Sequence, residues 1–513
     1  MCFMFSTIIS AAICGMNAML VHVEVDMAKG LPGFLMVGYL SSEVKEAGER
    51  VRVALKNSGI MLSPMRTTVN LSPANIRKEG TAFDLPIAVG MLRSMDYIKE
   101  EAVSGIMIVG ELSLNGKVNP IKGILPLVRR AKAEGIKRCL VPEENKAEGA
   151  VISGIEVIGA VSLQDALSYL RGERREEKRT EKVAGSKVRK REKAPDFSEI
   201  SGQAAAKRAA EIAAAGFHNL LLVGPPGSGK TMIANRLTGI LPPLTKDECL
   251  EVSSLYSVAG KLSSGKTLIE KRPFLSPHHT VTVSSLTGGG RIPRPGIISL
   301  AHLGVLFLDE MPEFGQHVLD MLRQPLEEKQ IHIDRIGGNC TYPADFMLVG
   351  ALNPCPCGYY PDVNRCRCTS ADIKKYQSRI SGPILDRVDL CAEVSQIAMK
   401  ELTGKGEGES SAFIRKRVIR ARKRQEERYS GRGYECNAGL TAKDIPRFCL
   451  LEDKEEKLME KAFSSLRLSA RGYYRILRVA RTIADLDESE QIKEIHLAEA
   501  ISYRMEGNKY WER

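Results

Sequence analysis

A glycine-rich segment in the middle of the chain constrains the fold more than any other feature. Residues 224–231 read Gly-Pro-Pro-Gly-Ser-Gly-Lys-Thr and fit the P-loop pattern GxxxxGK[ST]. An apolar run at 219–223 precedes them and predicts a buried strand, and a helix-like segment follows. Glycines in such a turn let backbone N–H groups face phosphate oxygens. The segment therefore predicts a nucleotide-binding loop at the end of a strand in an α/β fold.

A second apolar run, Val-Leu-Phe-Leu-Asp-Glu at 305–310, ends in two carboxylates. We expect Lys230 to reach the β- and γ-phosphates, Thr231 and Asp309 to hold Mg²⁺, and Glu310 to polarise the attacking water. The expected cofactors are therefore ATP and Mg²⁺. The residues expected to bind them are Gly224, Pro225, Pro226, Gly227, Ser228, Gly229, Lys230, Thr231 and Asp309.

Length and charge limit the remaining choices. The chain has 513 residues, too many for one core, and a net charge of +12. A basic balance favours an anionic partner, with nucleic acid first, although the charge could also serve solubility. The 12 cysteines do not form the dense framework of a small secreted domain, so we expect a cytoplasmic protein.

The apolar N-terminus, residues 3–20, is the one segment that suggests a membrane. It lacks the basic start of a signal peptide, and Ser6, Thr7, Ser10 and Asn17 interrupt it. The stretch that follows, 21–26, alternates apolar and polar residues. We therefore predict a pair of strands here and no membrane partner.

The pattern of the chain predicts four segments. Residues 1–170 alternate strands with helices, 171–194 form a charged linker, 195–400 form the nucleotide domain, and 401–513 are helical. A tail that binds DNA is the alternative for the linker. A basic helix at 414–428 could contact phosphates or could simply lie exposed at the junction of the helical domain. The expected strands of the first segment are 20–26, 67–71, 106–110, 138–141 and 155–158, and its expected helices are 43–57, 83–93, 123–134 and 162–170.

Three further polar residues stand where an ATPase would use them. Asn353 ends another apolar strand, where an amide can orient water, although a turn before Pro354 would also place asparagine there. Arg387 and Arg471 could stabilise charge on a transferring phosphoryl group, which the guanidinium fork does better than an ammonium group. Neither arginine would stand out by position alone.

These motifs occur in the order found in AAA+ ATPases, and the sequence between them is more specific. The chain resembles the magnesium-chelatase-like AAA+ ATPases of the YifB/ComM type over nearly its whole length. The stretches that carry the resemblance are 276–279 (Ser-Pro-His-His), 288–290 (Gly-Gly-Gly), 295–296 (Pro-Gly), 301–304 (Ala-His-Leu-Gly), 353–358 (Asn-Pro-Cys-Pro-Cys-Gly) and 381–383 (Ser-Gly-Pro).

The resemblance implies roles for these residues. Asn353 would be the first sensor, Arg387 an arginine finger that acts on a neighbouring subunit, and Arg471 the second sensor. The subunits would form a ring, expected to be a hexamer, with ATP between them. An insert near 276–292 and a hairpin within 321–346 would face a central pore and grip a polymer. Relatives of the ComM type act as DNA helicases in branch migration, so single-stranded or branched DNA is the expected partner.

Residues 1–170 resemble the Lon-protease-like domain of this family, which has a ribosomal S5 domain 2-like fold. Lon peptidases use a serine–lysine dyad, and the matching positions here are Ala82 and Leu125. Neither side chain can supply a nucleophile or a base, so we expect no peptidase activity. The full expectation is an α/β chain with this domain first, a P-loop AAA+ core next and a C-terminal helical lid.

Four cysteines cluster just after Asn353, in two Cys-x-Cys pairs. They could hold a tetrahedral Zn²⁺ ion, or they could form a reduced turn without metal. The residues are Cys355, Cys357, Cys366 and Cys368.

The sequence leaves three functions open. The leading hypothesis is a DNA motor for helicase activity or branch migration in recombination or natural transformation. The second is an ATP-driven remodeller of proteins, and the third is a regulatory ATPase that scaffolds partners. No convincing aromatic pore loop favours the second, and the intact Glu310 and Arg387 argue against the third.

Overall fold

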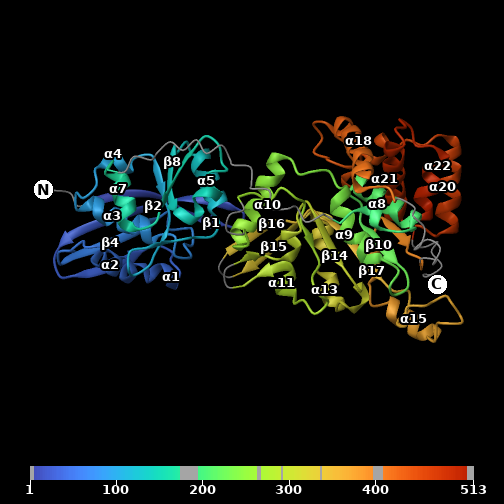
Figure 1. Ribbon diagram of the computed structural model, residues 1–513, viewed down its shortest axis with the longest axis horizontal. Helices are drawn as coiled ribbons and strands as arrows, with labels where there is room; N and C mark the ends of the chain where they lie inside the picture. The colour runs from blue at the N-terminus through green and yellow to red at the C-terminus, as the bar shows by residue number, and fades with distance from the viewer. Residues whose placement is uncertain are drawn as a thin grey trace.

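The computed structural model describes residues 5–173, 195–262, 267–290, 293–335, 338–396 and 408–504. Along the long axis, an N-terminal α/β part is followed by a central α/β part, with a helical part beyond it (Figure 1). The expected charged linker at 171–194 lies almost wholly outside the described residues. In the described part of the chain, no helix combines the length and the apolar character needed to cross a membrane.

The N-terminal sheet begins with the predicted strand pair. β1 (Phe5–Cys14) runs antiparallel to β2 (Asn17–Lys29), and buried and exposed residues alternate along β2. This alternation explains the polar residues that interrupt the apolar N-terminus, because one face of the pair contacts the core and the other does not. The strands of this sheet, in spatial order, are β3 (Gly33–Val37), β4 (Met65–Ser72), β2, β1, β5 (Ile106–Ile108), β8 (Arg138–Pro142) and β9 (Glu156–Ala160).

Helices cover this sheet at the positions that the apolar periodicity predicted, with one interruption. The expected helix at 43–57 divides at Glu46 into α1 and α2. The shorter elements α4, α6, β6 and β7 had no clear signal in the sequence. The helices are α1 (Ser42–Lys45), α2 (Ala47–Asn57), α3 (Asp84–Ser94), α4 (Glu100–Val103), α5 (Ile124–Ala133), α6 (Glu143–Gly149) and α7 (Leu163–Leu170), and a two-stranded ladder pairs β6 (Glu111–Leu112) with β7 (Val118–Asn119).

The central part is built on a parallel sheet whose strands are apolar on both faces. β10, β14 and β17 are buried at every position, as expected for strands covered by helices on both sides. The fold is the expected α/β class with a P-loop core. The strand order is β11 (Phe274–Leu275), β14 (Val305–Leu308), β17 (Met347–Leu352), β10 (Leu220–Val223) and β18 (Leu390–Glu393).

Short and long helices surround this sheet. α10 begins at a capping box formed by Thr245 and Glu248 and ends at Gly260, which is left-handed. The elements are η1 (Phe197–Glu199), α8 (Ala204–Gly216), α9 (Lys230–Ile240), α10 (Lys246–Ala259), α12 (Ile297–Leu300), η2 (Met311–Glu313), α13 (Gln316–Asp320), α14 (Arg323–Glu328), α15 (Ser370–Gln377) and α16 (Gly382–Leu385).

The expected hairpin is present and contacts the expected insert. β15 (Gln330–Arg335) pairs antiparallel with β16 (Gly338–Pro343). The insert contains α11 (Val283–Thr287) and a small ladder of β12 (Gly288–Gly289) with β13 (Arg294–Pro295). The Tyr342 hydroxyl of the hairpin donates a hydrogen bond of 2.8 Å to the Pro293 carbonyl of the insert. Arg291 of the insert lies outside the described residues.

The C-terminal helices pack against the central part and share its core. The predicted basic helix is α18 (Ser411–Tyr429), which buries Ile414 and Val418. Arg428 on this helix pairs with the buried Asp485, with 2.9 Å between Nη1 and Oδ2. The helix is therefore part of the packed core of this region. The other elements are η3 (Asn437–Gly439), α19 (Ile445–Phe448), α20 (Asp453–Ser465), α21 (Ala470–Leu486) and α22 (Glu494–Ser502).

The N-terminal and central parts meet where α5 packs against α10. The Gly123 amide donates to the Ser257 carbonyl at 3.1 Å, and the Ser257 hydroxyl donates to Glu148 at 2.5 Å. Burial raises the pKa of the Glu148 carboxyl. A turn of the N-terminal part also packs near the hairpin, because Met16 lies against the core that contains Tyr342.

Candidate nucleotide site

Three adjacent strands deliver the predicted nucleotide-binding residues to one edge of the central sheet. The P-loop follows β10, Asn353 follows β17, and Asp309 follows β14. These strands are parallel neighbours in the order β14, β17, β10. Their carboxyl ends therefore meet, which is where ligands bind in open parallel sheets.

Lys230 is the best-connected side chain at this edge. Its Nζ donates to the carbonyls of Gly224 at 2.7 Å and Pro225 at 2.9 Å, and to Oδ1 of Asn353 at 3.1 Å. Burial lowers the pKa of the Lys230 ammonium to about 8, although Asp309 and Glu310 oppose this shift. A buried cation held only by neutral oxygens is well suited to receive an anionic phosphate.

The two carboxylates at the end of β14 have different surroundings. Oδ2 of Asp309 accepts a hydrogen bond of 2.8 Å from the Thr231 hydroxyl, so the two expected Mg²⁺ ligands are already adjacent. Glu310 has φ 49° and ψ 48°, a left-handed conformation that is unusual for a residue other than glycine. Such strain is concentrated at functional sites, where it aims a side chain.

The shape of the loop fits a nucleotide phosphate. Gly227 and Gly229 have φ of 73° and 98°, and a Cβ at either would meet no described atom within 4 Å. By contrast, a Cβ at Gly224 would lie 2.1 Å from the Val394 carbonyl oxygen, so only glycine fits there. The buried hydroxyl of Ser228 has no hydrogen-bond partner among the described residues. An open cradle with an unpaired donor fits a phosphate, and the oxygens of Thr231 and Asp309 suit Mg²⁺.

Arg387 and Arg471 lie elsewhere, at the opposite edge of the same sheet. Asn219, which precedes β10, donates from its side chain to the Arg387 carbonyl at 2.8 Å, and its amide donates to Asp389 at 2.9 Å. This places Arg387 at the amino end of β10, whereas the P-loop follows its carboxyl end. Four residues at about 3.3 Å each put roughly 13 Å of strand between the two edges.

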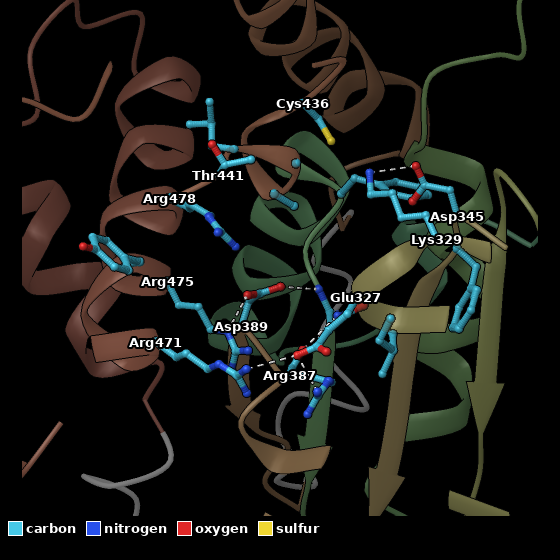
Figure 2. A pocket seen from close by; sticks show the side chains of 18 of the residues that line it. Glu327, Lys329, Asp345, Arg387, Asp389, Cys436, Thr441, Arg471, Arg475 and Arg478 are labelled. Atoms are coloured by element: carbon cyan, nitrogen blue, oxygen red, sulfur yellow. Dashed lines mark hydrogen bonds and ion pairs between the residues drawn. The ribbon is translucent and has the colours of Figure 1, made fainter. Parts of the chain in front are cut away.

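The two arginines converge on one carboxylate. Oε1 of Glu327 lies 2.5 Å from Nη2 of Arg387 and 3.3 Å from Nη2 of Arg471 (Figure 2). Ser469 caps α21 by accepting from the Gly472 amide at 3.1 Å, which holds Arg471 in the first turn of that helix. Nothing in the sequence near Glu327 indicates this meeting, because its two partners are distant in the chain.

These side chains border a cavity of about 400 Å³ between the sheet edge and α21 (Figure 2). Arg475 and Arg478 from the next turns of α21 also line it. Burial lowers the pKa of Arg475 to about 10. The ion pair with Asp389 acts in the opposite direction and raises this pKa. The neighbouring cations and hydrogen bonds hold the pKa of the buried Asp389 carboxyl far below its usual value. The sequence did not predict this second group of charges.

One further residue that the sequence did not single out contacts the P-loop. Gln203, just before α8, has a left-handed φ of 58°. Its side-chain amide donates to the carbonyls of Ser228 at 3.2 Å and Ser395 at 2.6 Å. It therefore ties the loop to the segment that follows β18.

The predicted cysteine cluster is brought together in space. The sulfur atoms of all four residues lie within 4.8 Å of one another, in the loop between β17 and α15. None of these thiols forms a disulfide.

The parallel sheet with the P-loop, Asp309 and Asn353 at one edge defines a nucleotide-binding protein of the AAA+ class. Three family models match the chain. The model described as "Magnesium chelatase, subunit ChlI" covers residues 196–402, "Subunit ChlI of Mg-chelatase" covers 23–145, and "Magnesium chelatase, subunit ChlI C-terminal" covers 408–504.

Full-length relatives narrow the family. The chain is 44% identical to competence protein ComM of Haemophilus influenzae over an alignment of 498 residues. This alignment covers 96% of each chain. It is 42% identical to the protein YifB of Escherichia coli over an alignment of 503 residues, and this alignment covers 97% of each chain. The chain therefore belongs to the YifB/ComM family of magnesium-chelatase-like AAA+ ATPases.

The N-terminal likeness to Lon is also present. Over 130 residues, or 25% of this chain and 23% of the relative, the sequence is 32% identical to Lon protease 2 of Bacillus subtilis. At the positions expected to match the Lon dyad, Leu125 is fully buried in the core around α5, and Ala82 offers no reactive group. The Lon-like domain and the helical C-terminal region complete the predicted fold class.

Proposed function

We propose that this protein is a Mg²⁺-dependent ATPase that forms a ring, expected to be a hexamer, and moves along single-stranded or branched DNA in the cytoplasm. The observation that supports a ring is the separation of the P-loop from Arg387 and Arg471. One subunit holds the phosphates at one sheet edge and presents its arginines at the other. A second subunit must therefore supply the arginines that complete each site.

The residues at the P-loop edge would bind the nucleotide and direct the water. Lys230 would exchange its carbonyl contacts for the β- and γ-phosphates. Mg²⁺, when bound by Thr231 and Asp309, would neutralise charge on these phosphates. Glu310 would accept a hydrogen bond from the attacking water, and the amide of Asn353 would orient it.

The arginines would stabilise the charge that builds on the γ-phosphoryl oxygens. In the free subunit Glu327 forms ion pairs with both of them. A neighbour's triphosphate would compete with this carboxylate for the two guanidinium groups. Nucleotide binding and assembly are therefore expected to favour each other. Assembly supplies arginines to the bound triphosphate, and the triphosphate supplies a partner for those arginines.

We expect Arg387→Ala to retain ATP binding and to lower the hydrolysis rate by about 1,000-fold or more, the usual worth of an arginine finger. Nucleotide affinity should stay near the wild-type value because Arg387 lies away from its own P-loop. Steady-state hydrolysis and equilibrium binding of a fluorescent ATP analogue would measure the two effects. Arg420→Ala is a suitable control, because Arg420 lies exposed on α18 and pairs with Glu488 at the surface.

Mixing two inactive variants tests whether Arg387 acts on its neighbour. An interface between an Arg387→Ala subunit, with its intact P-loop, and a Lys230→Ala subunit, with its intact arginine, contains one complete site. Mixed assemblies should regain part of the activity that neither variant shows alone. A wild-type rate per subunit that does not change when the protein is diluted to monomers would contradict the proposal.

Three observations support DNA as the polymer. The chain carries a net charge of +12, the hairpin and insert contact each other, and the relative from Haemophilus influenzae is named a competence protein. Competence denotes the uptake of DNA, so we propose a role in recombination or natural transformation. The decisive experiment compares ATP hydrolysis without DNA and with single strands, a forked duplex or a four-way junction. We expect stimulation by at least one of these DNAs.

We expect DNA affinity to fall steeply as salt rises, because each phosphate that the protein neutralises releases counterions. Each contact should contribute about 0.7 to the slope of log affinity against log salt on single strands. Replacing Arg291 and the exposed Arg294 with alanine should weaken binding and flatten this slope while basal hydrolysis remains. Fluorescence anisotropy of a labelled oligonucleotide between about 50 and 200 mM salt would measure it.

The matched control for this experiment replaces Lys457 and Lys461, two exposed lysines on α20, with alanine. It changes the net charge equally but leaves the insert intact. If affinity does not respond to salt, or if the insert variant binds as the control does, the DNA proposal fails. Stimulation of hydrolysis by unfolded polypeptide would then favour the protein-remodelling alternative.

A further inference from the structure

The loop between β17 and α15 holds four cysteine sulfurs at the spacing of a metal centre. The Sγ of Cys355 lies 3.3 Å from that of Cys357 and 3.8 Å from that of Cys366. The Sγ atoms of Cys357 and Cys366 are 3.6 Å apart, and the fourth sulfur, from Cys368, lies within 4.8 Å of the others. A tetrahedral centre with Zn–S bonds of about 2.3 Å has sulfur–sulfur edges of about 3.8 Å.

Backbone donors already surround the most buried of these sulfurs. The amides of Gly358 and Tyr360 donate to Sγ of Cys355 at 3.2 and 3.4 Å. Hydrogen bonds of this kind orient a metal ligand and stabilise the negative charge of a thiolate. The geometry thus resembles a ligand set that is ready for a metal.

The tip of the loop buries little apolar surface and is held by polar contacts, such as the hydrogen bond of 2.8 Å from Nη1 of Arg365 to Oε1 of Gln396. Residues 361–365 are exposed, and Val363 at the tip is 88% exposed. A polar loop that buries so little apolar surface gains little from packing, so a bound metal would stabilise it further.

We propose that these four cysteines bind one Zn²⁺ ion. Four thiolates in a tetrahedron suit zinc or iron, and a closed set of four protein ligands is typical of a structural zinc site. No coordination position would remain open for water, so the ion would have no role in chemistry of its own. Its effect would be on the position of the loop.

The position of the loop matters because it forms one wall of the nucleotide site. Cys355 follows two residues after Asn353, whose side chain contacts Lys230. Gly358 lies so close to the P-loop that a Cβ added there would be 2.4 Å from Cδ of Pro226. The zinc ion would therefore hold both Asn353 and Pro226 in place, an inference that rests on the proposed ATPase function.

Metal analysis of the full-length protein tests the site itself. Protein purified without a metal-affinity tag should contain one zinc ion per chain by plasma mass spectrometry. The double variant Cys366→Ser/Cys368→Ser should lose this zinc, whereas Cys14→Ser, at an exposed free cysteine, should keep it. Wild-type protein without stoichiometric zinc, or with iron in its place, would overturn the proposal.

A second readout does not depend on whether the double variant folds. Wild-type protein stripped of zinc and loaded with Co²⁺ should show the visible bands and the thiolate charge-transfer absorption of tetrahedral cobalt. Their absence would also overturn the proposal. Neither measurement requires hydrolysis, so either can fail while the ATPase proposal stands.

The link to the nucleotide site has its own test. Loss of zinc should lower the hydrolysis rate by up to about 100-fold, because small misplacements of catalytic groups have effects of this size. Zinc-free protein that retains its folded circular-dichroism spectrum and the full rate of the wild type would show that the metal does not position Asn353. Inactivity of the zinc-loaded wild type would instead refute the proposed ATPase function.

Discussion

Glu310→Gln should bind ATP as tightly as the wild type and hydrolyse it at least about 100-fold more slowly, since a positioned base contributes about 10² to 10⁴. The amide keeps the size of the side chain and its place after Asp309. It loses only the negative charge that polarises water. Equilibrium binding of a fluorescent ATP analogue and single-turnover hydrolysis measure the two steps separately.

Glu313→Gln provides the matched control for this change. Glu313 lies three residues on, at the end of η2, and forms a half-exposed ion pair with Arg379, with 2.7 Å between Oε1 and Nη1. Such pairs contribute about 1 kcal/mol or less. The control should therefore hydrolyse ATP near the wild-type rate. A Glu310→Gln protein as fast as its control would mean that another group directs the water.

Lys230→Ala should weaken ATP binding by about 10- to 100-fold, the equivalent of one or two charge-assisted hydrogen bonds. The variant removes the only contact that we assign to both the β- and γ-phosphates. Lys246→Ala, which changes an exposed lysine at the start of α10, is the matched control. Titration calorimetry would measure both affinities, and equal affinities would exclude Lys230 as the phosphate ligand.

The pH dependence of binding gives an independent check on the same residue. Burial lowers the pKa of Lys230 to about 8 in the free protein, and a bound phosphate favours its charged form. Below pH 8 the ammonium of Lys230 is already protonated. Above pH 8, Lys230 must take up one proton from solution each time ATP binds. Affinity should therefore fall about tenfold per pH unit above pH 8. This slope should disappear in Lys230→Ala.

The meeting of the proposed nucleotide-binding residues at one edge of the sheet was predictable because phosphate chemistry requires particular residues next to one another in the chain. The P-loop is local, and Asp309 and Asn353 each follow a recognisable apolar strand. The parallel sheet then brings them together without further information. The strand pair β1 and β2 was predictable for a similar reason, since its alternation of buried and exposed residues is visible in the sequence.

Elements that depend on contacts distant in sequence were not predictable. β3 is a short apolar run with Phe34 and Met36 partly buried and Leu35 half-exposed, so its periodicity is unclear without its neighbour β4. The meeting of Glu327 with Arg387 and Arg471 depends on how α14, the start of β18 and α21 pack. No local pattern encodes that packing, and single charged residues are common on any surface.

The placement of Lys230 and Arg387 at opposite edges of one sheet restricts how copies of the chain can associate. A two-fold dimer joins one surface patch to the same patch on its partner, so it would complete a site only if both edges belonged to that patch. A heterologous, head-to-tail contact joins opposite edges directly, and such contacts build either closed circles or open spirals. An open row leaves one P-loop without its arginines at one end. Closing the circle engages that last pair, so the closed form gains one working site over an open row of the same length.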